Sequence, residues 1–100
     1  MYFLHGKLTA KTGYRDKLAN ILLEASTLVS NTKGCKVYVI GKDANDINSV
    51  YVTEIWDNKS DHDDSLKVES VRALIMKGIP MLDNQPPKQQ ELEIIGGYGI

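Results

Sequence analysis

A carboxylate and an indole stand two positions apart near the middle of the chain, at Glu54 and Trp56. They close the segment 49–56, whose β-branched and aromatic residues predict a strand. Because side chains alternate along a strand, both residues point to the same face. A carboxyl group buried among apolar residues gains a raised pKa and becomes a usable base. The pair therefore predicts a proton-transfer site. The alternative is a carboxylate that pairs with Arg72 or caps a helix, next to a core tryptophan that donates to a backbone carbonyl.

Three other side chains could belong to such a site. Arg72 lies in a helical pattern, where its guanidinium could stabilise a phenolate or an oxyanion, or could simply face solvent. Tyr38 could offer its hydroxyl to a pocket or pack in the sheet. His62, within the acidic segment 61–64, could line the pocket, cap a helix or contact a second helix. The candidate catalytic residues are thus Trp56, Arg72 and Glu54, and the candidate pocket residues are Val52, Tyr38 and His62.

The chain carries no metal or phosphate motif. Two histidines and the single cysteine, Cys35, give no zinc spacing. Segment 57–62 is not a calcium loop, because Lys59 occupies the third position, which supplies a ligand, and His62 occupies the glycine position. The glycine-rich segment 96–99 follows a strand pattern and opens no helix, so it does not resemble a phosphate cradle. We therefore expect no haem, flavin or metal cofactor.

The elements that must position these residues follow from hydrophobic periodicity. Segment 14–30 has one apolar stripe at helical spacing, and Gly34 is expected to cap that helix in the left-handed conformation. A short helix is expected after Asn58 or Ser60, either of which could cap it. A second helix follows and ends at Gly78 and Pro80, with a buried stripe made of Val68, Val71, Leu74 and Ile75.

Four segments read as strands: 1–10, 35–41, 49–56 and 89–95. The polar turn 43–48 joins the second to the third as a hairpin. The order βαββααβ predicts a ferredoxin-like α+β fold, in which helices cover one face of a four-stranded antiparallel sheet. Segment 49–56 is apolar on both faces, so a second copy of the chain is expected to cover the other face and form a homodimer.

Composition sets the remaining bounds. The 100 residues suffice for a single domain, 1–100, in which the tail 96–100 is expected to be mobile. A net charge of -1 without a basic cluster argues against a nucleic-acid partner. No apolar run approaches the ~20 residues of a membrane span. A single cysteine allows no intrachain disulfide, which favours the cytoplasm.

Several short motifs together carry a family resemblance. They are Gly34-Cys35-x-x-Tyr38, Glu54-x-Trp56, His62-Asp63-x-Ser65-Leu66 and Val71-Arg72-x-Leu74-Ile75, followed by Pro80 and Leu82. Over about residues 3–95 the chain resembles the antibiotic biosynthesis monooxygenase family, in its branch of small stand-alone quinol monooxygenases. The resemblance implies a dimeric ferredoxin-like α+β barrel, in agreement with the pattern of segment 49–56.

The same resemblance implies a chemistry. Some family members oxidise polyhydroxylated aromatics with dioxygen and without metal or flavin, using a tryptophan and an arginine that match Trp56 and Arg72. Their asparagine four residues before the tryptophan is Val52 here, which removes one hydrogen-bond donor. A haem-degrading sister group has an asparagine at a position that falls at or near Gly6 here, and a histidine on a helix that has none in this chain. The expected function is a cofactor-independent monooxygenase of a small phenol or quinol. The alternatives are a dimeric module that binds a hydrophobic ligand or serves in a stress response, and an isomerase or hydrolase on the same scaffold.

Overall fold

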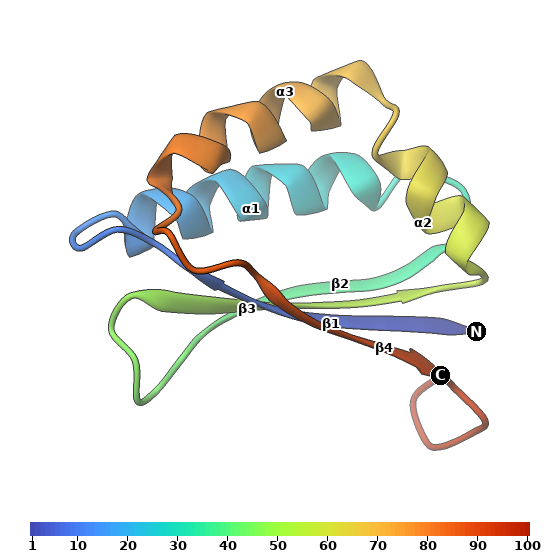
Figure 1. Cartoon of the computed structure of the whole chain (residues 1–100). Helices are drawn as coiled ribbons and strands as arrows, with labels where there is room; N and C mark the ends of the chain where they lie inside the picture. Colours follow the sequence, from blue (N-terminus) through green and yellow to red (C-terminus); the bar gives the residue numbers. More distant parts are fainter.

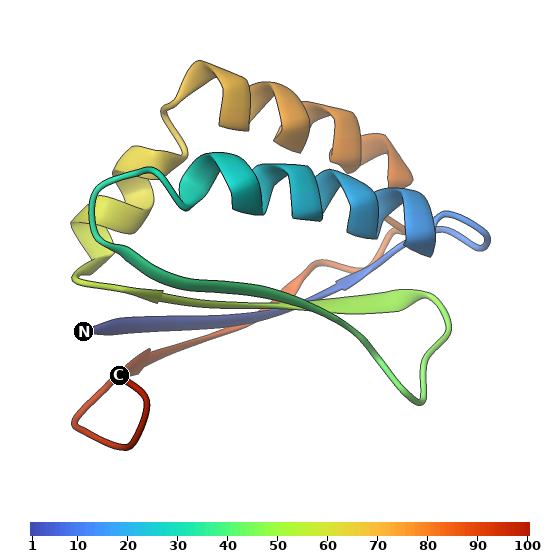
Figure 2. The ribbon, with the colours of Figure 1, turned by 180° about the vertical axis from the view of Figure 1, so that it is seen from behind.

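The computed structural model describes residues 1–100 and has the predicted βαββααβ order. Its elements are β1 (Tyr2–Thr9), α1 (Arg15–Val29), β2 (Cys35–Lys42), β3 (Ser49–Trp56), α2 (Lys59–Ser65), α3 (Glu69–Gly78), the 3₁₀ turn η1 (Ile79–Met81) and β4 (Lys88–Glu93). The three α-helices cover one face of the sheet, and the other face is bare (Figures 1 and 2). The ferredoxin-like α+β fold is therefore confirmed. None of the helices has the length and apolar character that crossing a membrane requires.

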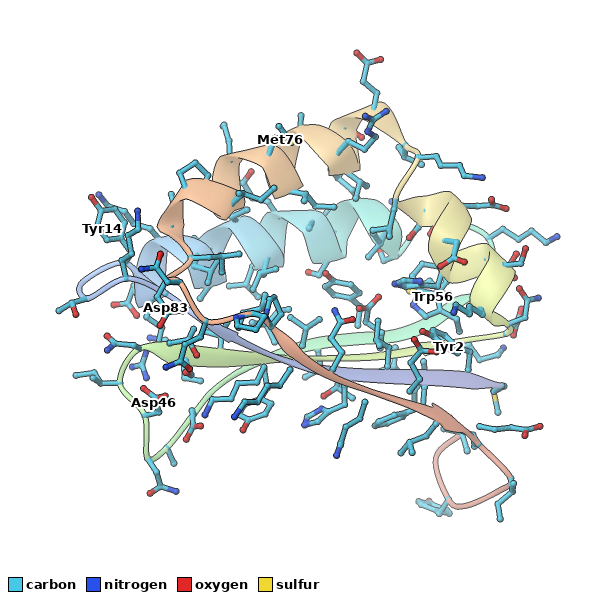
Figure 3. The ribbon with its side chains drawn as sticks, viewed as in Figure 1. Tyr2, Tyr14, Asp46, Trp56, Met76 and Asp83 are labelled. Atoms are coloured by element: carbon cyan, nitrogen blue, oxygen red, sulfur yellow. The ribbon has the colours of Figure 1, made fainter.

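The sheet is antiparallel throughout, with strand order β2-β3-β1-β4. The predicted β2–β3 hairpin is present, and β3 lies in the middle of the sheet beside β1. The register sets Tyr2 opposite Trp56 on one side of β3, and Tyr38 opposite Glu54 on the other. Residues that are distant in sequence thus converge at one end of the sheet, below α2 (Figure 3).

Two hydrophobic clusters hold the helices to the sheet. Near the start of α1, Leu18 and Ala19 pack with Val50 of β3. Near its end, Val29 packs with Trp56 and with Val71 of α3. The alternation predicted for segment 49–56 is confirmed, because Val50 and Trp56 point toward the helices and both are fully buried.

The ends of several elements differ from the sequence expectation. Asn58 caps α2, since its Oδ1 accepts a hydrogen bond of 2.8 Å from the backbone N–H of Asp61. Gly34, however, does not cap α1, because the helix ends at Val29 and a turn separates the two. Gly34 has φ +83° and instead opens β2 against Asp61. Strand β4 ends at Glu93 rather than at residue 95, and all its residues are exposed because it is an edge strand.

The expected apolar stripe of α3 is narrower than its sequence suggests. Val71 and Leu74 are buried, whereas Val68 and Ile75 are each 40% exposed. Helix α3 packs mainly on α1. One row of α3 side chains, spaced about one helical turn apart, is therefore enough to fill the contact. Gly78 lies at the end of this contact, where a Cβ atom would approach the Leu18 side chain to 3.4 Å.

Gly34 offers a test of the close contact between the β2 entrance and α2. A Cβ atom at Gly34 would lie 2.2 Å from Asp61 Oδ2, whereas Gly13, with a similar φ of +85°, has nothing within 4 Å. A left-handed backbone costs a non-glycine residue about 1–2 kcal/mol. Gly34→Ala should therefore lower the free energy of unfolding by at least about 1 kcal/mol more than Gly13→Ala does. Urea denaturation measures both, and equal losses would contradict the contact.

Candidate functional site

A cavity of about 480 Å³ lies between the sheet and its helices, within the size range of small-molecule sites. It is lined by 25 residues, 16 of them hydrophobic. Gly6 and Val52 face each other across β1 and β3 in its floor, and Leu22 and Leu74 come from α1 and α3. A Cβ atom at Gly6 would make an ordinary van der Waals contact of 3.4 Å with Gln89 Cγ. Gln89 is the polar residue beside Gly6, and the rest of the polar lining gathers at the α2 end: Tyr2, Tyr38, Glu54, Lys59, His62, Asp63, Ser65 and Glu91.

Glu54 supplies a buried carboxylate to this cavity. It lies in β3, faces the helices and is only 9% exposed. Its Oε1 accepts a 3.0 Å hydrogen bond from Trp56 Nε1 and lies 3.8 Å from His62 Nε2. Burial raises the pKa of Glu54, and the indole hydrogen bond and the histidine partly offset that rise. A carboxylate of raised pKa in an apolar cavity is the arrangement of a general base.

Trp56 contacts Glu54 and does not line the cavity itself. The indole is fully buried among Val29 and Val71, and its N–H donates to Glu54. A backbone carbonyl, the alternative partner, is therefore not the acceptor, and the expectation that Trp56 lines the pocket is wrong. Since Trp56 and Glu54 are two residues apart on one strand, the same pleat that buries the ring directs its N–H at the carboxylate.

His62 occupies the polar end of the cavity. Its ring lies 5.6 Å from the Tyr2 ring and meets the Trp56 ring edge-on at 5.7 Å. Its Nδ1 lies 3.0 Å from Asp63 Oδ1, and its Nε2 faces Glu54. His62 is thus a cavity residue, as expected, with contacts to the aromatic rings of two strands in addition to its place on α2.

Tyr38 lines the cavity opposite Glu54 in the register of β2 and β3. Burial, together with the negative charge of Glu54, raises the pKa of Tyr38. The phenol therefore stays protonated at neutral pH and can donate a hydrogen bond to a ligand. The same two causes raise the pKa of Cys35, which keeps that thiol out of the reactive thiolate form.

The structure does not bring Arg72 to the site. Arg72 is exposed and lies outside the cavity wall, while its neighbours Val71 and Leu74 on α3 point inward. The expectation that Arg72 and Trp56 reach one cavity is therefore wrong, as is the alternative that Arg72 pairs with Glu54. The physical reason is the 100° turn per helical residue, which carries a residue next to a buried one out toward solvent.

Sequence reasoning missed six polar cavity residues: Tyr2, Lys59, Asp63, Ser65, Gln89 and Glu91. Tyr2 comes from β1, Lys59 from α2 and Glu91 from β4. Lys59 Nζ lies 3.6 Å from Glu91 Oε2, so the two residues form an ion pair at this end of the cavity. No local signal marks these residues, because each reaches the site only through the strand order and the placement of α2. No group of three or more histidine, cysteine, aspartate or glutamate side chains is arranged to hold a metal ion.

The raised pKa of Glu54 makes stability depend on pH. Because the folded state holds this proton more tightly than the unfolded chain, its contribution to stability is present below the unfolded pKa of about 4.3 and is lost as the pH rises through the folded pKa. Glu54→Gln abolishes that loss and keeps an oxygen for the Trp56 N–H. The variant should therefore gain stability relative to the wild type as the pH rises from about 4 to 8.

Denaturation curves across this pH range measure the effect. Glu24→Gln, which removes an exposed carboxylate on α1, is the matched control and should show no such trend relative to the wild type. A constant difference between Glu54→Gln and the wild type would show that Glu54 titrates normally.

Known proteins resemble this chain in both sequence and fold. The family model described as antibiotic biosynthesis monooxygenase matches residues 1–76. A Chloroflexus aurantiacus structure, named provisionally as such a monooxygenase, is 37% identical with a TM-score of 0.85, over 99% of this chain and 97% of that one. A Deinococcus radiodurans structure with a similar name is 22% identical with a TM-score of 0.84, over 100% of this chain and 98% of that one.

Fold similarity extends to more distant sequences. A Nitrosomonas europaea structure is 12% identical with a TM-score of 0.87, over 96% of this chain and 100% of that one. No curated protein is similar enough to match. The family match, the identity to the Chloroflexus protein and the shared fold agree, and the chain belongs to the antibiotic biosynthesis monooxygenase family.

Proposed function

We propose that the protein is a cofactor-independent monooxygenase that oxidises a small phenolic or quinol aromatic with dioxygen. Family membership and the names of the similar structures support monooxygenase activity in general. The observation that carries the finer proposal is the buried Glu54 carboxylate in an otherwise largely apolar cavity of about 480 Å³. Such a cavity can hold an aromatic ring and remove a proton from its hydroxyl group.

The chemistry follows from the substrate's own electrons. Glu54 takes the phenolic proton, and the resulting anion passes one electron to dioxygen, giving a substrate radical and superoxide. Their combination forms a carbon–oxygen bond as a peroxide anion, which takes up one proton to become a hydroperoxide. Loss of water from a carbon that carried hydrogen then leaves a carbonyl, so the whole reaction releases no net proton. Both oxygen atoms are thereby accounted for, one in the product and one in water. The protein contributes a base, the Tyr38 hydroxyl as donor to the anion, and apolar walls that exclude water.

The charges of the cavity favour an uncharged substrate. Glu54, Asp63 and Glu91 are acidic, whereas Lys59 is already paired with Glu91. An aromatic carboxylate or phosphate would meet net negative charge there, while a neutral phenol would not. Because Arg72 lies in solvent, no guanidinium lines the cavity to bind an anionic group of a substrate.

A non-catalytic binding module is the second candidate. It is favoured by Val52, which offers no hydrogen bond where the family's aromatic oxidases have an asparagine, and by the position of Arg72 outside the cavity. Oxygen uptake separates the two candidates, and product analysis would separate an isomerase or a hydrolase from both.

Activity tests the proposal. The wild-type protein should consume dioxygen with a reduced quinol, and faster as the pH approaches the first pKa of the quinol, because the anion donates the electron. Glu54→Gln should lower kcat by about 10²-fold or more, the scale of a lost general base. Glu24→Gln should leave the rate unchanged. No uptake above the uncatalysed rate across a broad quinol panel would favour the binding module.

We also propose that the protein is a homodimer built through the bare sheet face. That face carries Phe3, Val37, Val39, Tyr51, Ile55 and Leu92. Val39 and Leu92 on this face are 56% and 54% exposed. A second copy presents the same surface, and a two-fold related pair covers both at once.

Tyr51→Asp tests this interface, because Tyr51 lies on β3 among the residues of the bare face. A charge placed in an apolar interface should weaken the dimer at least about 100-fold, or about 3 kcal/mol. Met76→Asp is the matched control, since Met76 is 67% exposed on α3, away from the sheet (Figure 3). Sedimentation measures both; a monomeric wild type at micromolar concentration, or equal effects of the two variants, would contradict the interface.

A further inference from the structure

His62 stands between a buried carboxylate and a surface carboxylate. Its Nε2 lies 3.8 Å from Glu54 Oε1, and its Nδ1 lies 3.0 Å from Asp63 Oδ1. The Glu54 and His62 side chains are 12% and 11% exposed, whereas the Asp63 side chain is 51% exposed. His62 therefore faces a buried carboxylate with one ring nitrogen and a half-exposed carboxylate with the other.

The hydrogen bond to Asp63 selects the tautomer of the imidazole. A carboxylate can only accept, so the neutral ring carries its hydrogen on Nδ1 and presents the lone pair of Nε2 to Glu54. The Tyr2 and Trp56 rings on either side limit rotation of the imidazole. His62 is thus prepared to accept a proton from Glu54 and not to donate one.

The other polar groups around Glu54 offer no equivalent route. Tyr38 and Cys35 on β2 hold their protons, because burial raises the pKa of each. Lys59 on α2 is paired with Glu91 of β4. Tyr2 of β1 faces the same end, and burial and nearby acidic groups raise its pKa too. Among these groups, only His62 has one ring nitrogen toward Glu54 and the other beside a half-exposed carboxylate.

We propose that His62, oriented by Asp63, is the proton exit of the active site. This inference rests on the proposed function, in which Glu54 accepts the phenolic proton. The O–H bond on Glu54 then breaks as an N–H bond forms at Nε2, and the Nδ1 proton leaves to Asp63 and water. Exchange with solvent restores the starting tautomer, and no electrons move. The proton that the peroxide anion later takes up comes from solvent, so the protons balance over the whole cycle. Because 3.8 Å exceeds a hydrogen bond, transfer passes through one water molecule or a small side-chain rotation.

The variants His62→Gln and Asp63→Asn test this path. Asp64→Asn is the matched control, because Asp64 lies on the same helix but pairs with Lys67 and is 66% exposed. Asp63→Asn changes a half-exposed side chain and should fold normally even if His62→Gln does not. The first readout needs no turnover: nitrogen NMR of the neutral His62 ring should show hydrogen on Nδ1 in the wild type. Hydrogen on Nε2 would overturn the proposal.

The second readout is quinol-dependent oxygen uptake. His62→Gln should lower kcat about 100-fold with little change in KM, and added imidazole should restore part of the rate. Asp63→Asn should lower kcat about 10-fold, and Asp64→Asn should not change it. Normal wild-type uptake with an unaffected His62→Gln variant would overturn the proton path alone. No uptake by the wild type would overturn the proposed function and the path with it.

Discussion

The hydrogen bond from Trp56 to Glu54 is the interaction on which the site depends. A carboxylate buried without a donor loses its hydration and gains nothing in return. Here the donor belongs to a ring with no exposed surface, wedged among Val29 of α1 and Val71 of α3. The packing that holds α1 and α3 against the sheet therefore also fixes the position of Glu54 Oε1 in the cavity. A change that loosens this cluster should disturb the fold and the chemistry together.

The division of the cavity into a polar end and apolar walls follows from the topology. The C-terminal half of β3 meets the start of β1 and the cap of α2, so Glu54, Tyr2 and His62 converge from three elements. The rest of the cavity lies between α1, α3 and the sheet, where Leu22, Leu74 and Val52 supply only hydrocarbon. In the proposed reaction this separation holds the hydroxyl group of the substrate at Glu54 and keeps water away from the substrate's ring.

The parts of the site that lie within one element were accessible to sequence reasoning. Alternation along a strand is a local property, so Glu54 and Trp56 could be assigned to one face. Contacts between elements were not accessible in this way. Whether His62 faces Glu54 depends on how α2 follows β3, and the presence of Tyr2 depends on β1 lying next to β3. Arg72 shows the limit most clearly: the apolar positions of α3 fit a broad stripe, and only the packing against α1 shows which side is covered.

The central claim is that Glu54 receives a phenolic hydroxyl group inside the cavity. The most direct measurement is a crystal structure of the protein grown without oxygen in the presence of a quinol. The account predicts a ring between β1, β3 and the helices, with one hydroxyl oxygen within about 3.2 Å of the Glu54 carboxylate. A quinol bound only on the bare sheet face, or in the cavity with its hydroxyl groups turned away from Glu54, would contradict it.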